Sequence, residues 1–183
     1  MESIQRSNAL FYLVKFSVVE EGKQLLLYLV IKNMLMNIII VALTFLAMEF
    51  MAWFTHKFVM HGFLWYLHKD HHQVEPGFFE KNDAFFLIFA VPSAYCYVTG
   101  LMYNDFRLFI GIGISLYGFA YFVVHEIIIH QRFKLFTRLN GRYVRAIRRA
   151  HKIHHKHLGK YQSENFGMLI VPLKYWIDPN TSK

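Results

Sequence analysis

Histidines dominate the chemistry that this sequence could support, because one arrangement of them occurs twice. Two histidines stand five positions apart, and a group of three histidines follows later, in which the second and third stand three and four positions after the first. The first copy comprises His56, His61, His68, His71 and His72, and the second comprises His125, His130, His151, His154 and His155. Of the eleven histidines, only His157 falls outside the arrangement. Imidazole binds zinc, copper, nickel and iron, so the pattern predicts a metal centre.

The number of histidines indicates two metal ions rather than one. A structural zinc site uses four ligands. A bis-histidine haem would leave the adjacent pairs His71-His72 and His154-His155 unexplained. A histidine-rich storage tract would not be embedded in apolar helices. The sequence also lacks obvious bridging carboxylates of the kind found in soluble four-helix di-iron proteins. Ten imidazoles are therefore predicted to surround two ions.

Helix geometry explains the spacing. On an α-helix, offsets of zero, three and four fall within about 100° of arc, so each later group is expected to share one face. An offset of five corresponds to about 140°, which suits a common face poorly. We therefore expect the helix to unwind locally between His56 and His61 and between His125 and His130. Five imidazoles from each half of the chain are then expected to converge on one cluster.

Three apolar segments are long enough to cross a membrane, which takes about 20 residues of helix. They cover residues 34–54, 84–102 and 108–124, and the last continues to position 129 apart from His125 and Glu126. A soluble domain within 183 residues has little use for three such helices. The expected fold is an all-α integral membrane protein. It has three or four transmembrane helices and a cytosolic, histidine-rich helical cap.

The net charge of +8 is concentrated after the last apolar segment, between Arg138 and Lys160. By the positive-inside rule this stretch faces the cytoplasm, which places the histidine motifs on the cytoplasmic side. Its position beside membrane helices favours anionic lipid or an acidic protein as partner over nucleic acid.

The remaining segments divide the chain. Residues 1–33 are predicted to be an N-terminal extension, which is either amphipathic or not native, and residues 34–183 form the membrane domain. Thr55–Gln73 and Tyr143–His157 are expected to be cytosolic helices. The tail Phe166–Ile177 is too short to cross the membrane, so it either lies at the interface or packs over the site.

Glu49 and Glu126 are the candidate catalytic carboxylates, because an ionisable residue within a span usually has a function. Glu49 precedes His56 by two helical turns, and Glu126 adjoins His125. Either glutamate could orient a metal-binding histidine through a hydrogen bond or a water. An interhelical hydrogen bond is the equally weighted alternative.

Several longer motifs contain these histidines. They include Ala52–Lys57, Met60–Trp65, Phe79–Asp83, Val124–Glu126, His130–Arg132 and Phe166–Gly167. With them, the chain resembles the fatty acid hydroxylase and sterol desaturase superfamily and, within it, the bacterial β-carotene hydroxylases. The likeness covers roughly residues 36 to 172. The family commonly has aspartate at the position of Glu126, which keeps the carboxylate.

The resemblance implies a non-haem monooxygenase in the bacterial inner membrane. The ten histidines would bind two iron ions, and molecular oxygen and electrons from a ferredoxin-type donor would complete the reaction. The implied reaction hydroxylates carbon 3 of each β-ionone ring, converting β-carotene to β-cryptoxanthin and then to zeaxanthin.

Two alternatives remain open from the residues. The same scaffold could act on another lipid, as a sterol or fatty acid hydroxylase or desaturase, or could form a ketone on a carotenoid. A non-enzymatic membrane metal carrier would need polar groups lining a path across the spans, and the apolar segments offer almost none.

Overall fold

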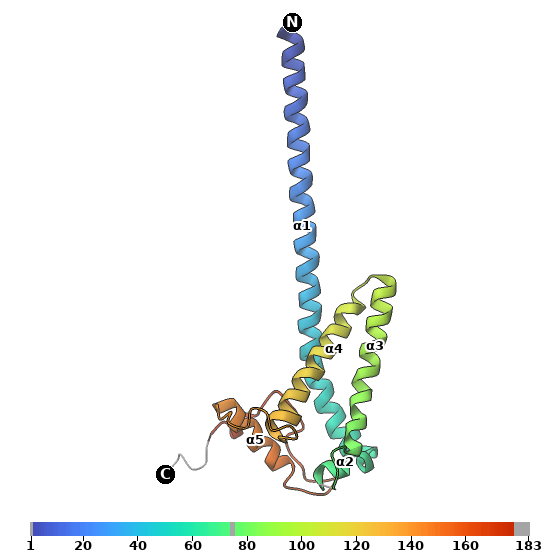
Figure 1. Cartoon of the computed structure of the whole chain (residues 1–183), viewed down its shortest axis with the longest axis vertical. Helices are drawn as coiled ribbons and strands as arrows, with labels where there is room; N and C mark the ends of the chain where they lie inside the picture. The colour runs from blue at the N-terminus through green and yellow to red at the C-terminus, as the bar shows by residue number, and fades with distance from the viewer. Residues whose placement is uncertain (1, 74–75, 178–183) are drawn as a thin grey trace. The chain divides into compact units, whose positions relative to one another are not determined.

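The computed structural model describes residues 2–73 and 76–177, and the side chains from residue 20 onward. The described residues form helices and connecting turns without a β-strand, which confirms the all-α expectation (Figure 1). The α-helices are α1 (Glu2–Phe54), α2 (Trp65–His72), α3 (Phe86–Tyr103), α4 (Arg107–Phe122) and α5 (Arg142–His154). Two π-helices, η1 (Thr55–Phe63) and η3 (Val123–Ile129), and two short 3₁₀-helices, η2 (Lys81–Phe85) and η4 (Leu173–Tyr175), complete the chain.

Two compact units divide at residue 39, and α1 belongs to both. Residues 2–39 are helical as part of α1, and the expected boundary between residues 33 and 34 stays a prediction. The described apolar side chains of this first unit, such as Leu26 and Ile38, are exposed.

Three helical stretches are long and apolar enough to cross a membrane, as predicted. They cover Glu20–Phe63, Lys81–Tyr103 and Arg107–Ile129. Each is longer than the apolar segment that predicted it, because helical structure continues past both ends of that segment. In the most apolar part of each stretch, at most 22% of the residues are buried within the protein, as expected of helices that face lipid.

A tight hairpin joins α3 to α4, which lie side by side in Figure 1. Asn104 ends α3 in the left-handed conformation (φ 50°), and Asp105 caps the start of α4 by accepting from the backbone N–H of Arg107 at 3.0 Å. Within the pair, the Ser93 hydroxyl donates to the Gly111 carbonyl at 3.0 Å. Small residues at the contact therefore let the two backbones approach closely, as is common between membrane helices.

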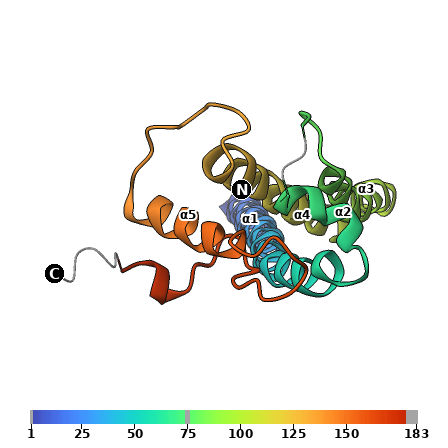
Figure 2. The same ribbon diagram turned by 90° about the horizontal axis from the view of Figure 1, so that it is seen from below.

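Helix α5 begins one residue before the predicted Tyr143 and ends at His154, three residues before the predicted end. Its buried Ala146, Ile147 and Ala150 pack against Val171 and Tyr175 of the tail. Figure 2 shows the tail, coloured red, beside α5. The basic side chains contribute to this packing. Arg148 donates to the carbonyl of Ile128 at 2.9 Å, and Arg149 donates to the carbonyls of Tyr175 and Ile177 at 2.8 and 2.6 Å.

Gly100→Ala is expected to destabilise the hairpin. A methyl group at position 100 would lie 2.6 Å from the Cα of Leu108, and backbone at this distance cannot yield as a side chain can. Overpacking of this kind costs about 1–3 kcal/mol, which should lower the thermal midpoint of the detergent-solubilised protein by several degrees.

Gly118→Ala is the matched control, because a methyl group there meets nothing within 4 Å. It should unfold at or slightly above the native temperature, as alanine is the better helix former. Equal stability of the two variants would contradict the close approach at Gly100.

Candidate metal centre

The ten patterned histidines come together from η1, α2, η3, α5 and the residues directly after η3 and α5. Two groups each have one ligand nitrogen per residue, and these nitrogens lie within 4.8 Å of one another. Cluster A comprises His56, His61, His68, His72 and His154, and cluster B comprises His71, His125, His130 and His151. The tenth, His155, lies between them, with its ring 4.4 Å from the rings of both His72 and His151.

The two halves of the chain exchange one histidine each, which the spacing did not predict. His71 lies in cluster B with three histidines of the second half, and His154 lies in cluster A with four of the first. Both occupy the middle position of their motif. On a helix that position diverges by about 100° from the histidine after it, whereas the outer two are only about 40° apart. In the first motif, the outer histidines His68 and His72 therefore share cluster A and the middle one, His71, reaches cluster B. In the second motif, His151 lies in cluster B and the middle one, His154, reaches cluster A.

The pairs spaced by five residues lie on π-helical turns. In η3 the His130 backbone N–H donates to the His125 carbonyl at 2.9 Å, and in η1 that of Leu64 donates to Val59 at 3.0 Å. This i→i+5 bonding replaces the α-helical pattern, so residues five apart become neighbours. The rings of His125 and His130 are 4.5 Å apart, and those of His56 and His61 are 5.3 Å apart. The local change of helix that the spacing required is thus a widened turn.

Every histidine of cluster A has its Nδ1 hydrogen-bonded to an uncharged oxygen. Four bind backbone carbonyls: His56 to Phe166 (3.1 Å), His61 to Lys160 (3.0 Å), His72 to His157 (3.1 Å) and His154 to Glu164 (2.8 Å). The fifth, His68, binds the side-chain oxygen of Asn82 at 2.6 Å. A proton held on Nδ1 by an acceptor leaves Nε2 as a lone-pair donor. All five Nε2 atoms are therefore available for a metal.

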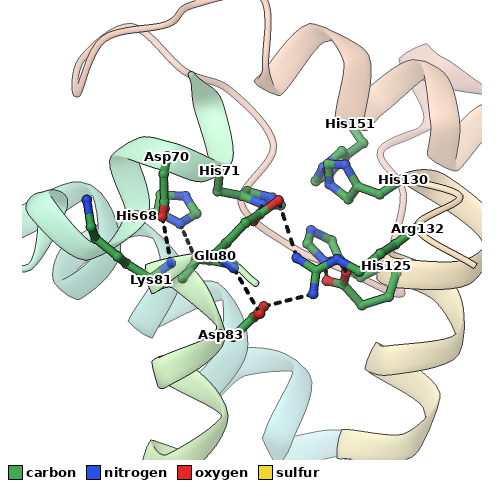
Figure 3. Close-up of polar contacts among 12 residues, drawn as sticks. His68, Asp70, His71, Glu80, Lys81, Asp83, His125, His130, Arg132 and His151 are labelled. Carbon is green, nitrogen blue, oxygen red and sulfur yellow. Dashed lines mark hydrogen bonds and ion pairs between the residues drawn. The ribbon is translucent and has the colours of Figure 1, made fainter. Parts of the chain in front are cut away.

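Two imidazoles of cluster B donate instead to carboxylates. His71 binds Glu80 at 2.8 Å, and His125 binds Glu126 at 2.6 Å. Arg132 lies between these glutamates, with Nη2 3.3 Å from Glu80 and Nε 3.0 Å from Glu126. Figure 3 shows this group, in which Arg132 also contacts Asp83 at 3.0 Å.

The ring nitrogens fit metal ions. The Nε2 atoms lie 3.2 Å apart in His56 and His68, and 3.3 Å apart in His61 and His154. Two nitrogens bound at about 2.1 Å to one ion would lie about 3.0–3.4 Å apart at right-angled to tetrahedral geometry. The Nε2 atoms of His72 and His155 are buried and have no hydrogen-bond partner in the described part of the chain. A bound cation would satisfy these lone pairs, so the residues present suit a two-metal centre.

Glu126 bonds to a patterned histidine, as one of the two expectations for it proposed, but Glu49 does not. The Glu49 carboxylate accepts from the Tyr117 hydroxyl at 2.7 Å, which is the interhelical alternative. It also accepts from the backbone N–H groups of Met168, Leu169 and Ile170 at 2.9–3.0 Å. These bonds connect the tail to α1. Of the two expectations for the tail, packing over the site is the one observed.

Phe166 is the side chain with which the tail covers cluster A. Its ring lies edge-on to His56, His61 and His154 at 5.1–5.5 Å between centroids. A pocket of about 510 Å³ reaches His61 and Phe166 from the side of Lys57 and Lys160. The tail thus covers one side of cluster A, and the pocket reaches the cluster at His61.

Residues that orient the histidines were missed among the candidate site residues. They are Arg132, Glu80, Asn82 and the backbone carbonyls of His157, Lys160, Glu164 and Phe166. The run from Glu80 to Asp83 at the start of the second span, and an arginine two positions after His130, were available signals. Asp83 accepts from the Glu80 backbone N–H at 3.1 Å, which caps the start of η2, and it also binds Arg132.

Desolvation keeps the imidazoles outside the spans neutral, which is the form that binds metal. It lowers the pKa of His72 and of His130 to about 4, with the neighbouring His61 and Arg132 adding in the same direction. Burial likewise lowers the pKa of His68, although its bond to Asn82 opposes the change.

Stability of the metal-free protein is expected to fall as the pH drops from about 6.5 toward 4. In that window the unfolded chain protonates its histidines and the folded chain does not, because the folded pKa values are depressed. Thermal unfolding of chelator-treated protein should show a lower midpoint at pH 5 than at pH 7.5. A midpoint that is unchanged or higher at pH 5 would contradict the depressed pKa values, and the range above pH 7.5 is the internal control.

Glu49→Gln is expected to release the tail. The glutamine amide keeps one oxygen, but its NH₂ group would face the backbone N–H groups that now donate to the carboxylate. Hydrogen bonds to a charged acceptor contribute about 1.5–3 kcal/mol each, and the variant would lose them. Hydrogen exchange at Met168–Ile170 should increase at least tenfold. Tyr117→Phe is the matched control, since it removes the interhelical bond and leaves the three backbone bonds. Equal exchange in both variants would assign no anchoring role to Glu49.

Comparison with known proteins agrees with this geometry. Residues 41–176 match the fatty acid hydroxylase family. A β-carotene hydroxylase of Paracoccus sp. (strain N81106 / MBIC 01143) is 35% identical over 137 residues, covering 74% of this chain and 85% of that protein. A β-carotene hydroxylase of Pseudescherichia vulneris is 36% identical over 136 residues, covering 74% and 77%.

A plant relative is similar over a smaller part of its length. The chloroplastic β-carotene hydroxylase 2 of Capsicum annuum is 34% identical over 129 residues, which cover 68% of this chain and 41% of that protein. No solved structure matches the chain. The matched region contains all ten patterned histidines, and the chain belongs to the fatty acid hydroxylase family as a homologue of the bacterial β-carotene hydroxylases.

Proposed function

We propose that the chain is a carotenoid hydroxylase that adds oxygen to carbon 3 of β-ionone rings, converting β-carotene to β-cryptoxanthin and then to zeaxanthin. The observation that carries the proposal is the pair of buried histidine clusters within a chain homologous to β-carotene hydroxylases. Each turnover would consume one oxygen molecule, two electrons and two protons, and would yield one hydroxyl group and one water.

The ten histidines would hold two iron ions as the proposed cofactor. With oxygen and electrons from a ferredoxin-type donor, bound iron supplies the oxidising power that an unactivated C–H bond requires. The protein's part is to present neutral imidazoles with Nε2 free, through the acceptors on Nδ1. Glu126 and Glu80 hold His125 and His71 in this form.

The spans and the clusters support access from the membrane. Both π-helical turns continue directly from helices that are long enough to cross it, so the clusters lie at the ends of these spans. An apolar polyene dissolved in the bilayer would reach the clusters from the ends of these spans. Phe166 of the tail, whose ring covers cluster A, would exclude water from that cluster. We propose that this end faces the cytoplasm of a bacterial inner membrane, because α5 carries the basic residues there.

The relatives favour a carotenoid over another lipid substrate. The bacterial and plant relatives compared above all have β-carotene in their names, whereas the family match alone would allow a fatty acid or a sterol. Two alternatives remain: the enzyme could form a carotenoid ketone, or the protein could carry metal without catalysing a reaction. The pigment test below separates both from the proposed hydroxylation.

The test is pigment analysis of a β-carotene-accumulating bacterial host that expresses the chain. The native chain is expected to yield β-cryptoxanthin and zeaxanthin. His71→Ala should leave β-carotene unchanged, with at least a hundredfold less product, because cluster B loses the histidine contributed by the other half of the chain.

His157→Gln is the matched control, since it changes the one histidine side chain outside the pattern and keeps the backbone. It should retain the product. Unchanged β-carotene from a native chain that is iron-loaded and in the membrane would contradict the proposed substrate. Keto-carotenoids would contradict the proposed product.

A further inference from the structure

The two clusters differ in the charge of the groups that orient their imidazoles. In cluster A, all five Nδ1 atoms donate to uncharged oxygens: four carbonyls and the Asn82 amide. In cluster B, His71 and His125 donate to the carboxylates of Glu80 and Glu126. The difference is one of chemistry and not of distance, because the bonds in both clusters span 2.6–3.1 Å.

A carboxylate acceptor makes an imidazole a stronger ligand. It withdraws the Nδ1 proton partly and thereby raises the electron density on Nε2, and removing such a partner typically weakens metal binding by about 10–100-fold. A neutral carbonyl has the same orienting effect with less electron donation. Cluster B therefore contains two imidazoles that are better donors than those of cluster A.

Arg132 determines how the two carboxylates are held. Each glutamate uses one oxygen for the arginine and the other for its histidine: Glu80 binds Arg132 through Oε1 and His71 through Oε2, and Glu126 binds Arg132 through Oε2 and His125 through Oε1. Asp83 occupies the remaining guanidinium nitrogen at 3.0 Å (Figure 3). A planar guanidinium has enough N–H donors, in fixed directions, for three such contacts. The ammonium group of a lysine has no such planar arrangement of donors.

The charge balance of this group favours a cation beside it. Three carboxylates and one guanidinium leave a formal charge of −2 (−3 + 1) next to cluster B, whereas the acceptors of cluster A contribute none. Arg132 prevents the carboxylates from repelling one another and from turning toward the metal position, and it does not neutralise them fully.

We propose that the two metal sites are inequivalent: cluster B binds its ion more tightly than cluster A, and Arg132 is the positioning residue that maintains the difference. The proposal rests on the two-metal centre of the proposed function. It adds which site fills first and which residues outside the ten histidines decide this.

The experiment is a titration of the metal-stripped, detergent-solubilised full chain with Co²⁺ in competition with a chelator. The native chain should bind two ions per chain in two affinity classes. Glu126→Gln and Glu80→Gln should each weaken the tighter class by about 10–100-fold and leave the weaker class in place. His56→Ala in cluster A should instead remove or weaken the weaker class.

The arginine variants separate positioning from a general structural role. Arg132→Gln should weaken the tighter class to the extent that the glutamine variants do, and Arg132→Lys should restore part of that loss, because it keeps the charge without the planar fork. Loss of fold would weaken both classes together, so the unaffected class is an internal control. Asp105→Asn, which removes a carboxylate from the α3–α4 turn, is the external control and should change neither class.

Three outcomes would overturn the proposal. A single affinity class in the native chain would show the sites to be equivalent. Equal weakening of both classes by Glu126→Gln and Glu80→Gln would remove the carboxylates as the cause. A native chain that binds no Co²⁺ would contradict the two-metal centre itself, and so the proposed function together with this inference.

Discussion

The structure of this protein depends on where the imidazole protons are held. Ten histidines can meet at one place and bind metal only if they are uncharged and each Nε2 is free, and an acceptor for the proton on Nδ1 favours that form. The protein supplies such acceptors for seven of the ten, from the chain before α3, the second π-helical turn and residues 157–166. These hydrogen bonds join segments that are distant in the sequence, and they act together with the apolar contact between α5 and the tail.

The membrane helices provide the frame on which this arrangement is built. Their close contact depends on small residues, and their apolar surfaces need no protein partner in lipid. Regular α-helix ends where the histidines begin: α1 and α4 continue into the π-helical turns η1 and η3, which form the ends of the first and third spans. The change costs regular hydrogen bonding, and it places side chains five residues apart on a common face. The two turns are thus local departures from ideal helix that the metal centre explains.

The sequence predicted the parts of this arrangement that depend on local spacing. The three spans, the family and the gathering of the patterned histidines follow from apolar runs and from intervals along one helix. The exchange of His71 and His154 was also implicit in helix angles, but the expectation of a common face for each motif overlooked it. Glu49 could not be assigned, because a carboxylate within a span has the same appearance whether it orients a histidine or anchors a distant backbone.

Contacts between distant segments were beyond prediction for a physical reason. Backbone carbonyls carry no signature in a sequence, so the acceptors supplied by the tail are invisible until the chain is folded. Arg132 has a side chain that could be seen, but its three partners come from two segments on either side of α3 and α4, and no periodicity connects them.

The exchange of histidines has a consequence for biogenesis. Cluster A needs His154 from α5 and the Phe166 carbonyl from the tail, and both follow the third span in the chain. During synthesis, the first half of the chain therefore emerges with four of the five imidazoles of cluster A, and no segment made before α5 can complete that cluster. The site can form only after the last span has been made. A ribosome-bound chain that has made only the first two spans would carry histidines without the partners that complete either cluster.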